Sequence, residues 1–193
     1  MDFSDFQPAL FAATVMNAFE PPWCIAGGWA IDLWLGRLTR NHADVEVAIF
    51  REDQITLRDF LHDWTFRAIA ADGTPRVLRD RQLLMLPVHE LQARNRQGRE
   101  IEFLLNECDT VDWIYRRDAR IRWPRDAWTV RGAFGVPVLV PHLVLLYKSK
   151  SPRPQDELDF RTAVPELAPE LRRWLAEALR LANVHHPWLQ QLI

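Results

Sequence analysis

The chain has 193 residues, a formal net charge of −2 and 48% hydrophobic residues, which suffices for one compact domain with a buried core. This near-neutral charge gives no global field that would favour nucleic-acid or membrane binding. No apolar run approaches the roughly 20 residues that span a bilayer, and no basic segment precedes an apolar stretch at the N-terminus. We therefore expect a cytoplasmic protein in which Cys24 and Cys108 are reduced.

Sequence patterns predict a mixed α/β core in the first part of the chain. Ser4 or Asp5 is expected to cap the first helix, and Gly36 to end the second. The expected helices cover residues 6–19, 29–35 and 54–61. The expected strands cover residues 23–26, 44–50, 64–69, 76–86, 99–106 and 113–117.

A helical tail follows, with expected helices at residues 141–150, 154–164 and 169–182. A proline begins each of these segments, where the first turn of a helix accepts it. The fold class is therefore α/β (α+β), with a mixed sheet packed by helices. We expect a catalytic core at residues 1–135 and a small helical region at 136–193 that completes a cleft.

Two carboxylates, Asp44 and Glu46, alternate with apolar residues on an expected strand. Positions i and i+2 of a strand point to the same face, so the two acids would lie side by side. Mg²⁺ binds such carboxylate oxygens together with substrate phosphates. Taken alone, the same pattern also fits the solvated face of a strand.

A Gly27-Gly28 turn lies upstream, between an expected strand and helix. Such glycines allow close backbone approach, and a helix N-terminus offers free N–H groups to an anion. It is not a Walker loop, because no Gly-Lys-Ser/Thr follows. The turn together with Asp44 and Glu46 predicts a triphosphate and metal site at neighbouring strand ends.

A third acid is expected, because two metal ions need a shared and an unshared set of carboxylates. Glu102 is the candidate, since it lies on a strongly apolar strand where an unpaired acid is costly. The alternative is a residue of an edge strand that faces water.

These motifs resemble the DNA-polymerase-β-type nucleotidyltransferases, in particular the aminoglycoside 2''-adenylyltransferase-like family. The matching segments are Gly27-Gly28-Trp29-Ala30-Ile31-Asp32 and Gly36-Arg37-Leu38-Thr39-Arg40-Asn41-His42-Ala43-Asp44-Val45-Glu46, followed by shorter ones at 89–90, 102–107, 145–148, 156–160 and 186–189. The resemblance runs from about residue 20 to 190 and implies an adenylyltransferase that uses ATP and two Mg²⁺ ions.

The resemblance also implies roles by position. Asp44, Glu46 and Glu102 would bind the metal ions, and Glu102 could accept the proton of the acceptor hydroxyl. Gly27 and Gly28 would contact the ATP phosphates, and Lys148 would pair with phosphate. This chain departs from the usual pattern, because Glu46 and Glu102 stand where the superfamily usually has aspartates, and His142 stands where a glutamate is expected.

Other residues near the motifs have more open roles. Arg40 and His42 could steady the triphosphate or simply pack the loop, and Asp32 could hold that loop through Arg37 or Arg40. Trp29 is expected to line the site, because it directly follows the glycines.

Cations are informative here, since the chain has 22 arginines but only two lysines. A lysine retained against this bias is a candidate for a point charge, which favours Lys148, although a solvated lysine is the alternative. Lys148 and Lys150 would stand about 200° apart on a helix, so we do not expect both at one site.

The sequence leaves several hypotheses for the identity of the acceptor. A hydroxyl-bearing small molecule such as an aminoglycoside-like antibiotic is the first hypothesis. Six arginines in residues 76–99 and six in 116–131 would favour an anionic acceptor such as RNA if they face the cleft. A regulatory or toxin-like enzyme acting on RNA or protein, and a non-catalytic nucleotide-binding module, are the alternatives. The sequence does not define the oligomeric state.

Overall fold

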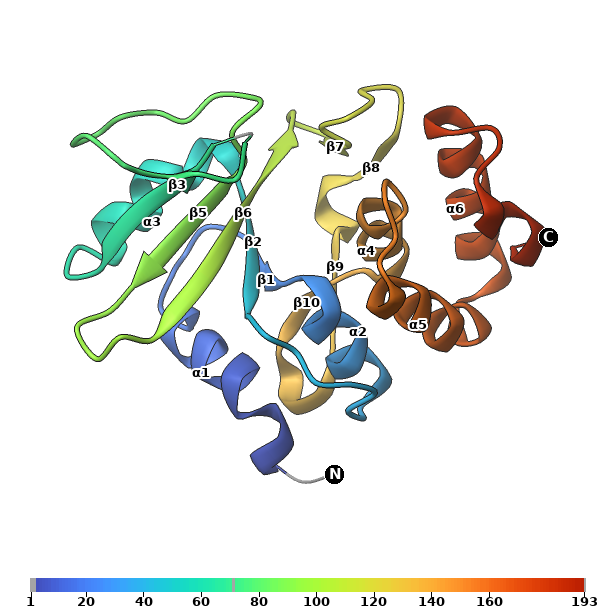
Figure 1. The fold of residues 1–193 in the computed structure, drawn as a ribbon, viewed down its shortest axis with the longest axis horizontal. Helices are drawn as coiled ribbons and strands as arrows, with labels where there is room; N and C mark the ends of the chain where they lie inside the picture. The colour runs from blue at the N-terminus through green and yellow to red at the C-terminus, as the bar shows by residue number, and fades with distance from the viewer. Residues whose placement is uncertain (1–2, 71, 193) are drawn as a thin grey trace.

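A curved sheet with helices on its faces makes up most of the molecule (Figure 1). The computed structural model describes residues 3–70 and 72–192. Neighbouring strands follow the order β4-β3-β5-β6-β2-β1-β10-β9, and β7 pairs with β6 and β8. The strands are β1 (Trp23–Ile25), β2 (Glu46–Phe50), β3 (Thr65–Ile69), β4 (Pro75–Val77), β5 (Glu90–Arg94), β6 (Glu100–Cys108), β7 (Asp112–Ile114), β8 (Arg122–Pro124), β9 (Thr129–Arg131) and β10 (Pro137–Leu139).

Within the described residues, six α-helices accompany the sheet: α1 (Gln7–Met16), α2 (Gly27–Leu35), α3 (Gln54–Phe60), α4 (Pro141–Lys148), α5 (Pro154–Ala163) and α6 (Pro169–Ala182). In the described part of the chain, none of them has the length and apolar character needed to cross a membrane. This architecture confirms the expected mixed sheet packed by helices.

The strand–Gly-Gly–helix unit forms as predicted. β1 is almost wholly buried, and α2 begins at Gly27 itself. Gly36 ends α2 in the left-handed region with φ 69°, which a glycine adopts without steric cost. The first helix was predicted less well, because α1 is preceded by the short 3-10 helix Phe3–Phe6, and its N-cap is Phe6 rather than Ser4 or Asp5.

The strand that carries the acids begins two residues later than expected. β2 starts at Glu46, and Asp44 lies in the loop just before it. The residues of β2 after Glu46 are fully buried, because β1 and β6 flank the strand on both sides.

The second half of the sheet differs most from expectation. Residues 76–86 contribute only the short strand β4, while β5 lies in a segment for which no strand was expected. The strands β8, β9 and β10 were not predicted either, because a strand of three residues is too short to show an alternating pattern. β10 pairs in parallel with β1 through Ile25 and Val138, so the sheet extends slightly beyond residue 135.

The helical tail forms as predicted, with α4, α5 and α6 each starting at a proline. Figure 1 shows these three helices gathered on one side of the molecule, next to α2. α4 contacts α2, α5 and α6, and its residues 141–146 are all buried. The tail therefore packs directly beside the strand–Gly-Gly–helix unit.

Candidate active site

Carboxylates from two parallel strands lie next to each other at the start of β2. The register of the β2–β6 pairing places Glu46 opposite Glu102, and that of β5–β6 places Gln92 opposite Glu102. Gln92 Nε2 donates a hydrogen bond of 3.3 Å to Glu102 Oε1. Asp44 precedes Glu46 by two residues. The structure thus brings the three predicted acids to one end of the central strands.

A fourth acid, Glu90, belongs to the same group although sequence reasoning gave it no role. It lies two residues from Gln92 on β5, and so on the same face. Burial raises the pKa of Glu90, and the charge of Asp44 raises it further. The only signal in the sequence was that Glu90 falls within one of the matching segments.

Mutual repulsion and burial both affect these carboxylates. Burial raises the pKa of Glu46, and the charges of Asp44 and Glu90 add to this while Lys148 opposes it. The pKa of Glu102 rises to about 7, mainly through burial and then through the charges of Glu90, Asp44 and Glu46. A positive charge placed among these oxygens would remove the repulsion.

The Gly-Gly turn packs tightly against functional side chains. A Cβ atom at Gly27, whose φ is +58°, would overlap the Glu46 carboxylate. A Cβ atom at Gly28 would collide with the Arg40 guanidinium and the His42 ring. Both positions therefore require glycine in this arrangement.

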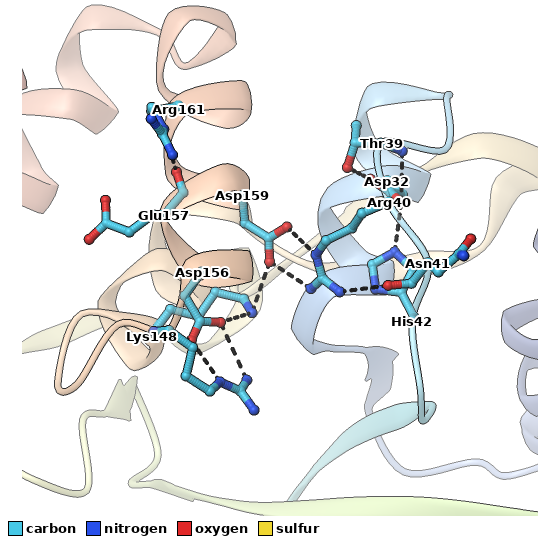
Figure 2. A network of polar contacts seen from close by, with 11 residues as sticks. Asp32, Thr39, Arg40, Asn41, His42, Lys148, Asp156, Glu157, Asp159 and Arg161 are labelled. Carbon is cyan, nitrogen blue, oxygen red and sulfur yellow. Dashed lines mark hydrogen bonds and ion pairs between the residues drawn. The ribbon is translucent and has the colours of Figure 1, made fainter.

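Asp32, fully buried on α2, organises the loop that leads to Asp44 (Figure 2). Its carboxylate accepts hydrogen bonds from the Thr39 backbone N–H (3.1 Å), the Thr39 hydroxyl (2.5 Å) and His42 Nε2 (2.6 Å). The expectation that Asp32 acts through Arg37 or Arg40 is wrong. A nearby hydroxyl and imidazole satisfy the carboxylate, and Arg40 points to α5 instead.

Arg40 and Lys148 converge on two acids of α5 (Figure 2). Arg40 donates through Nε and Nη2 to Asp159 at 2.7 and 2.8 Å. Lys148 Nζ lies 2.7 Å from Asp156 Oδ1 and 2.9 Å from Asp159 Oδ2. The Lys148 side chain is only 10% exposed, so it is not a solvated lysine.

Trp29 was expected to line the site, but it is buried beneath the Asp44 loop and does not line the cavity described below. The side chain is buried, its Nε1 donates a 3.0 Å hydrogen bond to the Asp44 carbonyl, and its ring lies 4.4 Å from that of His42. The His42 side chain is only 2% exposed. Both residues fix the backbone that carries Asp44.

A cavity of about 420 Å³ opens beside these groups, between the sheet and the segment that joins α4 to α5. Lys148 and Lys150 both line it, although we expected only one of them at the site. The helical angle does not apply, because α4 ends at Lys148. Of the twelve arginines in residues 76–99 and 116–131, only Arg116 and Arg117 line this cavity.

The three predicted acids have the chemistry of a metal site but not its geometry. Within residues 3–70 and 72–192, no three His, Cys, Asp or Glu side chains are arranged to hold a metal ion. The donor set still suits Mg²⁺, because Asp44, Glu46 and Glu102 offer only carboxylate oxygens and two of them are paired across adjacent strands. The Glu46 carboxylate lies against Gly27.

His142 is fully buried in the described structure, and neither ring nitrogen has a hydrogen-bond partner there. Its ring packs against Trp123 and Trp174, at centroid distances of 4.3 and 5.0 Å. Burial lowers the pKa of His142 to about 3. His142 therefore packs here as a neutral aromatic ring.

A model of the aminoglycoside-2''-adenylyltransferase family matches residues 12–161. The chain belongs to this family. As a member of the aminoglycoside-2''-adenylyltransferase family it is an enzyme, a nucleotidyltransferase of a group associated with antibiotic resistance. No sequence among the curated proteins matches it.

Solved structures share the fold of this family member. One is the antibiotic-resistance factor ANT(2'')-Ia in complex with adenylyl-2''-tobramycin, with 18% identity, a TM-score of 0.57, and coverage of 91% of this chain and 98% of that chain. Another is the lincosamide antibiotic adenylyltransferase LnuA bound to lincomycin, with 12% identity, a TM-score of 0.55, and coverage of 80% and 93%. These similarities support the nucleotidyltransferase fold.

Proposed function

We propose that the chain transfers AMP from ATP, with two Mg²⁺ ions, to a hydroxyl group of an antibiotic-like small molecule. The observation that carries this proposal is the pairing of Glu46 with Glu102, beside Gly27 and just after Asp44. This arrangement suits a metal–triphosphate complex. The carboxylates would bind the metal ions, and the glycine turn with its helix N-terminus would bind the phosphates.

Each predicted residue has a place in this reaction. Asp44, Glu46 and Glu102 would hold the metal ions, which when bound neutralise the phosphate charge. Gly27 and Gly28 would receive the phosphates, and Lys148 would supply a positive charge to them. Arg40, His42 and Trp29 would act mainly by positioning the Asp44 loop, since their polar groups already have protein partners.

The bond changes are those of an in-line displacement. The acceptor oxygen forms a bond to the α-phosphorus, and the bond between that phosphorus and the bridging oxygen breaks. Pyrophosphate leaves with the bonding electrons. Glu102 would take the hydroxyl proton and pass it to solvent. The proposed catalytic core is residues 1–135, and residues 136–193 would complete the cleft.

Calorimetry with ATP, in Mg²⁺ and in EDTA, tests the metal-dependent part of this proposal. Without metal, the triphosphate would face Asp44, Glu46, Glu90 and Glu102, so we expect at least about tenfold weaker binding. Equal affinity in EDTA would rule out the two-metal arrangement.

Pyrophosphate release with a panel of hydroxylated small molecules, which includes aminoglycosides and lincosamides, and with tRNA and proteins tests the acceptor. We expect release, and a product heavier by one AMP, with a small molecule only. RNA as the substrate would instead show transfer that falls steeply with salt, because phosphate contacts release counterions. Metal-dependent ATP binding without transfer to any acceptor would favour a non-catalytic module.

A further inference from the structure

Two adjacent arginines line the cavity without an acidic partner. In the described part of the chain, no Asp or Glu oxygen lies within 4.0 Å of the guanidinium group of Arg116 or Arg117. Beside them, Lys148 and Arg153 both pair with Asp156, at 2.7 and 2.9 Å. Lys150 also lines the cavity, and like the two arginines it has no Asp or Glu oxygen within 4.0 Å in the described structure. The positive charge of Arg116 and Arg117 is therefore available to a ligand.

Neutral groups hold both guanidinium groups in place. Arg116 Nη2 donates to His89 Nε2 at 2.7 Å, and the guanidinium lies 5.5 Å from the ring centroid of Tyr147. Arg117 Nη1 donates to the Tyr115 hydroxyl at 3.1 Å and to the Tyr147 carbonyl at 2.9 Å. These bonds orient the two side chains without neutralising them.

The charge of Arg116 is opposed by its burial and by its neighbour Arg117. Arg116 is half-buried, and burial followed by the charge of Arg117 lowers its pKa. Burial also lowers the pKa of His89, and both arginines contribute to that shift. Arg117 itself is exposed, so the cost falls on the half-buried Arg116, and a bound anion would offset it.

The strand position that holds the partner of Arg116 is offset along β6 from the position beside the glycine turn. His89, the partner of Arg116, accepts a 2.8 Å backbone hydrogen bond from Leu105. Leu105 is three residues beyond Glu102 on β6, which corresponds to roughly 10 Å. Gly27 instead lies against Glu46, directly across from Glu102. The two ends of the cavity therefore offer different chemistry.

An in-line displacement decides which end receives the acceptor. The attacking hydroxyl and the leaving pyrophosphate lie on opposite sides of the α-phosphorus. If Gly27 and Gly28 hold the leaving phosphates, the acceptor approaches from the side of Arg116. The cavity floor on this side includes Ala48, Leu104 and Leu105, which suit a carbon skeleton.

We propose that Arg116 and Arg117 bind an anionic group of the acceptor, a phosphate or a carboxylate. The acceptor would then be a hydroxylated small molecule with an acidic substituent rather than a polycation, whose ammonium groups the same arginines would repel. This inference rests on the proposed function, because that function assigns the glycine end of the cavity to the nucleotide.

The test is calorimetry on the whole chain, with Mg²⁺ and an ATP analogue that has a methylene bridge between the α- and β-phosphorus. Inorganic phosphate and acetate are titrated in separate arms, which distinguish the two kinds of anion. We expect the wild type to bind one of them, and Arg116→Gln and Arg117→Gln each to weaken that binding about tenfold. Arg116→Lys, which keeps the charge, should retain part of it.

Arg96→Gln is the matched control, because it removes the same charge from an exposed turn at the far end of the β5–β6 hairpin. It should not change anion binding. Circular dichroism verifies that each variant is folded.

Three results would overturn the inference. The first is that the wild type binds neither anion, and the second is that Arg116→Gln and Arg117→Gln bind them as the wild type does. The third is that these variants lose affinity for the analogue instead, which would assign the arginines to the nucleotide. Failure of the proposed function is separate, because it appears as absent Mg²⁺-dependent binding of the analogue to the wild type. The anion titrations without nucleotide then still report on the arginine pair.

Discussion

Arg40 donates two hydrogen bonds, of 2.7 and 2.8 Å, to Asp159, which lies 119 positions later in the chain. The bond joins the loop before Asp44 to helix α5, so it fixes one side of the site to the other. Burial alone would raise the pKa of Asp159, but hydrogen bonding to Arg40 and the charge of Lys148 lower it overall.

Arg40→Ala should lower the free energy of unfolding by about 2 kcal/mol, because it removes a charged hydrogen-bond donor from the fully buried Asp159. Urea denaturation measures this. Arg94→Ala is the control, since its partner Glu100 is 3.5 Å away and both side chains are 61% exposed. Such surface pairs contribute about 0.5 kcal/mol or less. Equal losses in both variants would show that the Arg40–Asp159 bond does not stabilise the fold.

Lys148→Ala should weaken ATP binding and also lower stability, by about 1–3 kcal/mol, since it leaves Asp156 and Asp159 with less compensation. These buried partners could not be seen in the sequence, which left a solvated lysine as the alternative. Lys148→Arg keeps the charge and should recover most of the stability. Calorimetry and urea denaturation on both variants separate the two effects, and unchanged ATP affinity in folded Lys148→Ala would exclude a role in binding phosphate.

Gly27→Ala should abolish transfer and cost more than the usual penalty for a left-handed residue. A side chain at a positive φ costs about 1–2 kcal/mol, and here the Cβ atom would also push the Glu46 carboxylate away. Gly73→Ala is the matched control, because Gly73 has φ +81° and nothing within 4 Å of an added Cβ. It should show the backbone penalty in thermal denaturation while transfer continues. Near-normal transfer by Gly27→Ala would contradict the proposed phosphate contact.

Asp44→Asn should abolish transfer without destabilising the protein. The Asp44 side chain is exposed, and the carbonyl that accepts the Trp29 hydrogen bond is retained. Loss of its charge also relieves repulsion on Glu46 and Glu102, so the melting temperature without metal should stay or rise. Asp126→Asn, another exposed acid, is the control for pyrophosphate release. A variant that unfolds would assign Asp44 a structural role instead.

His142 should make stability sensitive to acid. The folded state keeps the ring neutral to a pKa of about 3, while the unfolded chain binds a proton below about pH 6.5. Stability from this residue is therefore present above pH 6.5 and falls as the pH drops towards 3, by about 2 kcal/mol between pH 7 and 5. Urea denaturation at both pH values should show a smaller loss for His142→Phe. His62→Phe, at an exposed position, should leave the loss unchanged, and parallel behaviour of both variants would refute the assignment.

Local signals in the sequence predicted the parts of the fold that local physics determines. Proline marked the start of α4, α5 and α6, and Gly36 marked the end of α2. Strands β8, β9 and β10 depend on pairing with other strands and have only three residues each, so the sequence showed no periodic pattern that could predict them.

The candidate site shows the same division. Glu46 and Glu102 were identifiable as acids on apolar strands, whereas their adjacency arises from the parallel pairing of β2 with β6. No local pattern distinguished Glu90, and none indicated that Asp32 would engage Thr39 and His42. The partners of a buried charge are set by tertiary packing, which spacing along one strand does not encode.

The parallel pairing of β1 with β10 also affects the order in which the molecule can be built during synthesis. β1 and the Gly27 turn emerge early from the ribosome, but Val138, which pairs with Ile25, and Asp159, which binds Arg40, emerge much later. Until then, β1 would have one open edge, and the loop before Asp44 would lack its anchor. Contacts so distant in sequence slow folding, because the loop-closure entropy is lost before they form. The nascent chain would thus be most exposed to strand-to-strand aggregation in the interval before β10 and α5 are made.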